Sequence, residues 1–266
     1  MRATAKHFTP FGNLALVQLQ VEPLSDVHFR PGGPELQSGG LVISEATGQG
    51  VVGMLLAVNN TKDQLLLTDA DVLTGAKQNR VLNKSVLLAP GTKIPIDVSC
   101  IERLRWQYTS QNFSNPASVA DLRLRKSKIS PVPSPKEEPQ MPDYHTQQRV
   151  WKCVTHSLLD AGLISLTESY EELAYKQAEK LTDAPQCESF ADCNALALLV
   201  EGQVASVDIF GNEACFRHYF PLLRDAAFRS HAATSKDPVD QHEAFYKAAE
   251  AVDLFLEAKR HHDETY

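Results

Sequence analysis

Residues 71–106 read DVLTGAKQNRVLNKSVLLAPGTKIPIDVSCIERLRW, and this stretch decides how the first half of the chain is interpreted. Val81 to Leu88 is rich in Val and Leu, which is typical of a strand. Pro90-Gly91 favours a turn, because Pro suits its second position and Gly accepts a positive φ. Thr92 to Ile101 then alternates apolar and polar residues as a returning strand. We therefore predict a β-hairpin.

The polar side chains best suited to bind a ligand gather in the same stretch. Gly75-Ala76 has little side-chain bulk, so the backbone can turn sharply or approach another group closely there. Amides beside an Arg and a Lys suit phosphate, ribose or carboxylate groups. The alternative is that they tie down loops and cap backbone groups. The candidate ligand-binding residues are Lys77, Gln78, Asn79, Arg80, Asn83, Ser85, Arg105 and Trp106.

Carboxylates that could act as a base are few near this block. Glu102 follows the returning strand, and Asp208 lies in an apolar strand-like run, VASVDIFG. A carboxylate among apolar neighbours needs partners or an altered pKa, so Asp208 is either catalytic or a cap at the end of its strand. Trp106 is interpreted either as a stacking ring or as an anchor for the sheet. Cys100 fits a small buried residue better than a nucleophile.

The run GAKQNRVLN, followed by PGTKIPIDVSCIE and RLRW, resembles a known family. This is the ARG and rhodanese-phosphatase-superfamily-associated protein domain family, where ARG stands for ADP-ribosylglycohydrolase. The resemblance extends over about residues 10–230, and the GAKQNR block is its most specific part. Such families place an acidic residue before the Gly, and the nearest one here is Asp71, a further catalytic candidate. The resemblance implies an association with systems that handle NAD and ADP-ribose.

Composition narrows the class of protein. The chain has 266 residues, 43% of them hydrophobic and 22% charged, as is ordinary for a globular protein. A net charge of -7 argues against broad binding to nucleic acid or acidic membranes. No apolar run reaches the roughly 20 residues of a membrane helix, and no signal peptide is apparent. Five cysteines, an odd number, favour reduced thiols in the cytoplasm, and no Cys or His spacing indicates a metal site.

The order of the expected elements predicts an α+β fold. Residues 13–100 are mostly short strands with short turns, which suggests an antiparallel sandwich or a strongly curved sheet. A Pro-rich segment, about residues 129–147, is typical of a mobile linker. From Gln148 the pattern is helical, interrupted by two expected strands within residues 194–210. We expect the helical half to pack on the β-rich half as one domain, residues 1–266.

Two classes of function remain open. In the first, the protein binds or processes an ADP-ribose-like or NAD-like molecule through the GAKQNR block, with Glu102 or Asp208 as a candidate base. In the second, it is a non-catalytic interaction or regulatory module with a protein partner in such a pathway. A pocket where Lys77, Arg80 and a carboxylate converge favours the first class. The use of these groups in backbone hydrogen bonds favours the second. The sequence specifies neither a reaction nor a cofactor.

Overall fold

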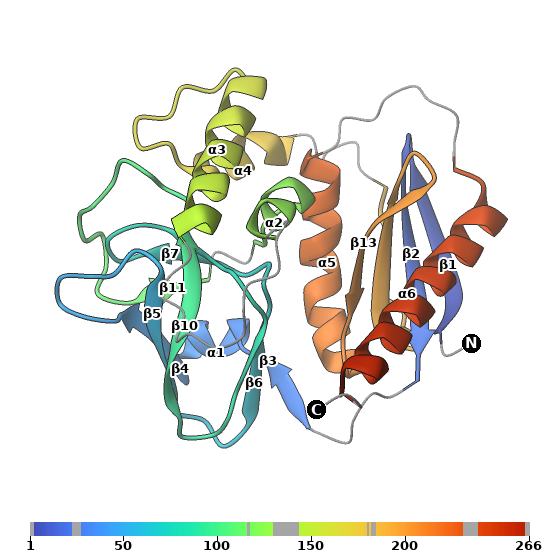
Figure 1. Cartoon of the computed structure of the whole chain (residues 1–266), viewed down its shortest axis with the longest axis horizontal. Helices are drawn as coiled ribbons and strands as arrows, with labels where there is room; N and C mark the ends of the chain where they lie inside the picture. Colours follow the sequence, from blue (N-terminus) through green and yellow to red (C-terminus); the bar gives the residue numbers. More distant parts are fainter. Residues whose placement is uncertain are drawn as a thin grey trace. The chain divides into compact units, whose positions relative to one another are not determined.

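The chain divides into two compact units, shown in Figure 1. The central unit is residues 28–179, and the N/C unit combines residues 1–27 with residues 180–266. This computed structural model describes residues 3–22, 28–115, 118–129, 144–179, 181, 185–230 and 239–263. Each unit is described below by itself. The expectation that both form a single domain stays a prediction.

The N/C unit is built on a four-stranded antiparallel sheet in the order β1-β2-β12-β13. The two strands expected within residues 194–210 are confirmed, and they join strands from the start of the chain. Two helices, α5 and α6, follow in sequence. The bounds are β1 Ala3–Phe11, β2 Leu14–Val21, β12 Ala195–Val200, β13 Gln203–Ile209, α5 Glu213–Ser230 and α6 Gln241–Asp263.

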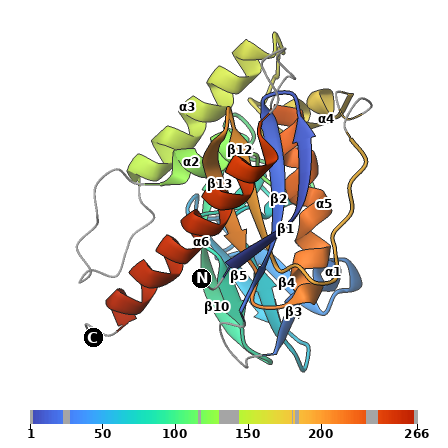
Figure 2. The same ribbon diagram turned by 90° about the vertical axis from the view of Figure 1, so that its right-hand side faces the viewer.

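Alternation along the strands gives this sheet two apolar faces. On one face, Val17 of β2 and Ala197 of β12 pack with Ala244, Ala248 and Val252 of α6. Small Ala side chains on both elements let helix and sheet approach closely. Figure 2 shows α6 running obliquely over the strands. An aromatic cluster that includes Phe210, Phe216 and Tyr219 anchors α5 to the residue that follows β13.

The central unit contains a six-stranded sheet in the order β11-β7-β8-β10-β5-β4. Its two edge strands meet, because Ser44 of β4 forms a bridge with Asn112, the residue before β11. The sheet therefore curls round on itself, and of the two predicted alternatives the curved sheet is the one observed. The bounds are β4 Leu41–Glu45, β5 Met54–Asn59, β7 Val72–Gly75, β8 Arg80–Leu82, β10 Lys93–Cys100 and β11 Phe113–Ser114.

A smaller sheet, β3-β6-β9, accompanies the curved one. The prediction of one continuous strand over Val81 to Leu88 is wrong, because residues Asn83 to Ser85 interrupt it. Its first part, β8, pairs antiparallel with β10, as the predicted hairpin requires, whereas its second part, β9, pairs with β6, so only the outer part of the hairpin forms. The bounds are β3 Phe29–Pro31, β6 Gln64–Leu67 and β9 Val86–Leu88. Apolar residues of both sheets share one core, which includes Leu55, Leu65 and Leu82.

Helices cover part of the curved sheet. Val150 and Val154 of α3 pack with Val72 of β7 and Val81 of β8. The Gln147 side chain also bonds both backbone groups of Cys100, at 2.8 and 2.9 Å. The bounds are α1 Gly33–Ser38, α2 Leu122–Lys128, α3 Tyr144–Asp160 and α4 Tyr170–Ala178.

Part of the predicted Pro-rich linker, about residues 129–147, is helical. Residues 144–147 form the first turn of α3, so the expected linker extends too far in this direction. Residues 130–143 of it lie outside the described residues. The α+β class itself is confirmed, with antiparallel sheets early in the chain and long helices later. Among the described residues, no helix is both long and apolar enough to cross a membrane.

Candidate functional site

The GAKQNR block forms a tight turn between β7 and β8. Gly75 and Ala76 have φ angles of 111° and 40°, both in the left-handed region. This φ at position 75 strains any residue with a side chain, and a Cβ there would also collide with the Ser110 hydroxyl, so the position favours glycine. The backbone of Ala76 then bonds the segment after Trp106: its N–H donates to Ser110 Oγ at 2.9 Å, and its carbonyl accepts from Thr109 N at 3.0 Å. The block therefore positions residues 105–110.

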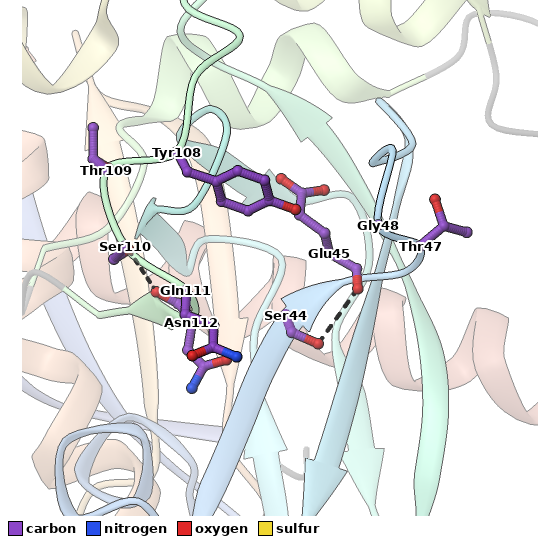
Figure 3. Close-up of a pocket in the computed structure, with 9 residues that line it drawn as sticks. All are labelled: Ser44, Glu45, Thr47, Gly48, Tyr108, Thr109, Ser110, Gln111 and Asn112. Atoms are coloured by element: carbon purple, nitrogen blue, oxygen red, sulfur yellow. Dashed lines mark hydrogen bonds between the residues drawn. The ribbon is translucent and has the colours of Figure 1, made fainter.

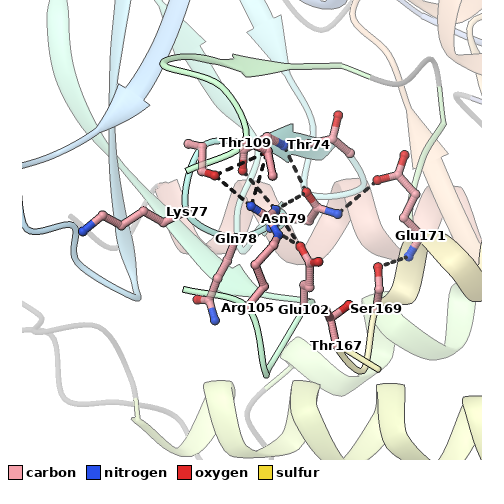
Figure 4. Close-up of polar contacts among 12 residues, drawn as sticks. Thr74, Lys77, Gln78, Asn79, Glu102, Arg105, Thr109, Thr167, Ser169 and Glu171 are labelled. Atoms are coloured by element: carbon pink, nitrogen blue, oxygen red, sulfur yellow. Dashed lines mark hydrogen bonds and ion pairs between the residues drawn. The ribbon is translucent and has the colours of Figure 1, made fainter. Parts of the chain in front are cut away.

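Asn79 and Arg105 form a hub of polar contacts, drawn in Figure 4. Asn79 Oδ1 accepts from Gly75 N and from Arg105 Nη2, both at 3.0 Å, and Nδ2 donates to Glu171 at 3.1 Å. Arg105 pairs with Glu102 at 2.6 Å, and Glu102 also accepts from Asn79 N. Burial and the nearby Glu102 carboxylate raise the pKa of Glu171. These contacts attach the turn to α4 through Glu171. The Glu102 carboxylate is engaged in the ion pair with Arg105.

Arg80 is the most deeply buried polar residue of the block, with 0% of its surface exposed. Its Nη1 donates to Gln78 Oε1 at 3.1 Å, and its Nη2 lies 4.0 Å from Glu45 Oε1. Within the described part of the chain, Arg80 Nε and Nη2 and Glu45 Oε2 have no hydrogen-bond partner. Burial lowers the pKa of Arg80, yet a guanidinium stays charged in proteins. Arg80 and Glu45 thus form a buried, loosely bonded ion pair.

Lys77 points away from the hub, as Figure 4 shows. Its Nζ donates to Gln49 O at 2.7 Å. The same ammonium lies 5.2 Å from the ring centre of Trp106 and 5.1 Å from that of Tyr108, within the range of cation–π attraction. Its backbone N–H donates to Glu45 Oε1 at 3.2 Å. Lys77 therefore holds two partly exposed aromatic rings beside the buried ion pair.

A groove of about 710 Å³ opens where β4 meets the segment before β11. This is the place where the Ser44–Asn112 bridge closes the curved sheet. Figure 3 shows the Tyr108 ring extending across it toward Glu45. Tyr108 is 51% exposed, so much of its ring is open to a ligand. The groove is lined by Ser44, Glu45, Thr47, Gly48, Tyr108, Thr109, Ser110, Gln111 and Asn112.

The remaining predicted site residues have local structural partners. Asp71 is fully buried and accepts from Thr68 N at 2.6 Å and from Asn115 Nδ2 at 3.2 Å, so it caps a turn. Asn83 donates to Asp97, and Ser85 Oγ accepts from a backbone N–H. Their ligand and catalytic roles stay predictions.

Asp208 lies on β13 of the N/C unit, whereas Glu102 and Asp71 belong to the central unit. Cys100 is fully buried, and burial raises the pKa of its thiol, which fits the interpretation of a small buried residue.

Sequence reasoning missed the residues that shape the groove. Glu45 and Tyr108 lie far from the GAKQNR block along the chain, and neither belongs to a motif with a fixed spacing. The curl of the sheet brings them together. One signal was present in the sequence: an acidic residue at the end of an apolar strand, LVISE, is a carboxylate that needs a partner.

Comparison with known protein families covers almost the whole chain. A model of the ARG and Rhodanese-Phosphatase-superfamily-associated Protein domain, ARPP-1, matches residues 3–266. The chain belongs to this family. The resemblance carried by the GAKQNR block is thereby confirmed, and the ARPP-1 match extends beyond the residues that suggested it. The ARPP-1 name links the family to proteins associated with ADP-ribosylglycohydrolase. No curated protein and no solved structure matches the chain.

Proposed function

We propose that this protein is a binding module of an ADP-ribosylglycohydrolase-associated pathway and that it binds an ADP-ribose-like molecule in the groove beside Tyr108. The observation that carries the proposal is the half-exposed Tyr108 ring set in a polar groove of about 710 Å³. Grooves of roughly 300–1,000 Å³ are the size that holds small ligands and cofactors.

The chemistry of the lining suits the parts of such a ligand. An aromatic face stacks on a nucleobase, because every base has a π-face. The hydroxyls and amides of Ser44, Ser110, Gln111 and Asn112 both donate and accept, as ribose hydroxyls require. In this proposal Lys77, whose ammonium lies against the Tyr108 ring, supplies positive charge for a phosphate. The family name independently supports an ADP-ribose pathway.

In this proposal the GAKQNR block acts mainly as the support of the groove. Asn79 and Arg105 hold the start of the segment that carries Tyr108. Arg80 is buried beneath Trp106, its guanidinium 5.9 Å from the ring centre. A ligand can therefore reach Arg80 only after a side chain above it moves. Lys77 is the block residue that we expect to contact the ligand.

Substitution of Tyr108 tests the proposal. Loss of a stacking ring costs about 1–3 kcal/mol per base, or roughly 5- to 150-fold in affinity. We expect the wild type to bind ADP-ribose in calorimetric titration and Tyr108→Ala to bind it more weakly by that factor. AMP and free ribose, titrated in parallel, report which part of the ligand the groove holds.

Tyr175→Ala is the matched control, because Tyr175 is an exposed tyrosine of α4 outside the groove lining. This variant should bind as the wild type does. Equal affinity of Tyr108→Ala and the wild type for ADP-ribose would reject the groove as the site. Absence of binding by the wild type to ADP-ribose, NAD and AMP would reject the ligand class.

A second candidate function, an interaction module for a protein partner, is favoured by one surface. Residues 159–175, from the end of α3 into α4, include four exposed large apolar side chains, and Ile164 is 90% exposed. Clustered exposed apolar residues are typical of protein–protein contacts. The others are Leu159, Leu166 and Tyr175. Should the wild type bind none of the nucleotides, this surface becomes the leading candidate.

A further inference from the structure

Three groups able to ligate a metal meet in the N/C unit, although one of them lies far from the other two in sequence. His7 belongs to β1, whereas Asp192 and Cys193 form the turn before β12. His7 Nε2 lies 3.5 Å from Asp192 Oδ1, and Cys193 Sγ lies 3.7 Å from the same oxygen. All three ligand atoms are within 4.8 Å of one another. No residue of the groove takes part.

The fold holds these groups in place. The pairing of β1 with β2 shifts register between Ala5 and His7, which is the signature of a bulge, and bulges re-aim side chains. The His7 ring stacks on Phe190 with 3.4 Å between ring centres. Phe190 O also accepts from Cys193 N at 3.1 Å, which closes the turn that carries the other two groups. The cluster is therefore preorganised by the backbone and by stacking.

Two of the three separations between the ligand atoms match those of a tetrahedral site. Zinc binds His nitrogen and carboxylate oxygen at about 2.0–2.2 Å and Cys sulfur at about 2.3 Å. Tetrahedral angles then separate nitrogen from oxygen by about 3.4 Å and sulfur from oxygen by about 3.6 Å. The observed separations of 3.5 and 3.7 Å are close to both values. The His7–Asp192 separation is longer than a typical N–H···O hydrogen bond of about 2.7–3.2 Å, whereas the Cys193–Asp192 separation also suits an S–H···O hydrogen bond.

The competing interpretation is a polar cluster without metal. Lys6 Nζ lies 3.8 Å from Asp192 Oδ2, so Lys6 neutralises part of the Asp192 charge. It approaches the other carboxylate oxygen, however, and leaves Oδ1 to His7 and Cys193.

We propose that His7, Asp192 and Cys193 form a site for a divalent transition metal, with zinc as the best fit. The ligands are His7 Nε2, a carboxylate oxygen of Asp192 and Cys193 Sγ. Soft thiolate and imidazole ligands select zinc over magnesium or calcium. Binding forms a sulfur–metal bond and releases the thiol proton to solvent. Three protein ligands leave a fourth position for water or another donor, as in open zinc sites. The proposal revises the expectation, drawn from spacing along the chain, that no metal site is present.

Cobalt titration of the full chain, after treatment with a chelator, tests the site directly. Tetrahedral Co²⁺ bound to a thiolate gives a sulfur-to-cobalt charge-transfer band and intense visible bands, which Zn²⁺ then removes. We expect both in the wild type and in the control variants Cys153→Ser and His156→Ala, which alter a cysteine and a histidine of α3. Cys193→Ser should abolish the charge-transfer band. His7→Ala should weaken Co²⁺ binding at least tenfold.

Asp192→Asn keeps the test decisive should the buried Cys193 variant fail to fold. Asp192 is half exposed in a turn, so this change should leave the fold intact. Zn²⁺ should raise the melting temperature of the wild type, because a metal that binds only the folded state stabilises it, and should raise that of Asp192→Asn much less. A wild type without the charge-transfer band, or equal stabilisation of both proteins by Zn²⁺, overturns the proposal.

Discussion

At the scale of single residues, Arg80 has the clearest energetic role. Removal of one partner of a buried ion pair leaves the other charge uncompensated and typically costs about 3–5 kcal/mol. We expect Arg80→Met to lower the free energy of unfolding by about 3 kcal/mol, since Glu45 then loses its cation. Urea denaturation at neutral pH measures the change.

Two further variants separate charge from packing at Arg80. The double variant Arg80→Met, Glu45→Gln should recover part of the loss, because the buried charges are then removed as a pair. Arg217→Met is the matched control, since Arg217 pairs with Glu213 on an exposed surface, where ion pairs contribute little. An Arg80→Met protein as stable as the wild type would contradict this role.

The sequence indicated that the side chains of the polar block interact, but it did not indicate that their partners are mostly other groups of the protein. Asn79 and Arg105 do bond each other, and Lys77 and Arg80 both lie against the Trp106 ring. Their burial could not be predicted, because it depends on the curl of a sheet whose edge strands lie far apart along the chain. For the same reason the sequence could not point to Tyr108 as a groove residue.

At the scale of elements, α2 is fastened to the sheets through its last residue. Lys128 is buried, and its ammonium donates to the carbonyls of Asp69 and Leu82. Burial, only partly offset by the Asp69 carboxylate, lowers the pKa of Lys128 from 10.5 to about 8. Between these two pH values the unfolded chain binds more protons than the folded one at this residue. The contribution of Lys128 to stability should therefore rise with pH across this window.

Comparison with Lys128→Met isolates this effect from other groups that titrate at high pH. The stability of the wild type relative to the variant should increase by up to about 3 kcal/mol between pH 8 and 10.5. Thermal or urea unfolding at several pH values measures it. Lys84→Met, which removes an exposed lysine, is the matched control for loss of a charge. A flat or falling difference for Lys128 would show that the amine is not held as described.

Elements with strong periodicity were predicted well, and elements without it were not. The strands within residues 194–210 and the final helix follow from clear apolar patterns. The strand expected over Val81 to Leu88 failed at Asn83 to Ser85, where polar residues break the ladder and send β9 to another sheet. Partner choice between sheets is a tertiary effect that local propensity does not contain.

At the scale of the whole molecule, separation of the chain at residues 130–143 should leave two pieces that do not fold. The N-terminal piece keeps β1 and β2 but lacks β12 and β13, and the C-terminal piece has the reverse. The separation also removes α3 from the core that α3 shares with β7 and β8. Residues 1–129 and 144–266, expressed separately, should show no cooperative thermal transition. Two independently cooperative pieces would reject the single domain predicted from the sequence.

The pairing of β2 with β12 also means that β2 is synthesised long before its partner strand. When Leu14–Val21 leaves the ribosome, its partner strand is still untranslated and begins only at Ala195. At roughly 5–20 residues per second, the delay is about ten to thirty-five seconds. During this time the nascent β1–β2 segment presents an apolar strand edge, a template for pairing with other chains. We therefore expect the amino-terminal strands of newly made chains to need protection from aggregation until β12 has emerged.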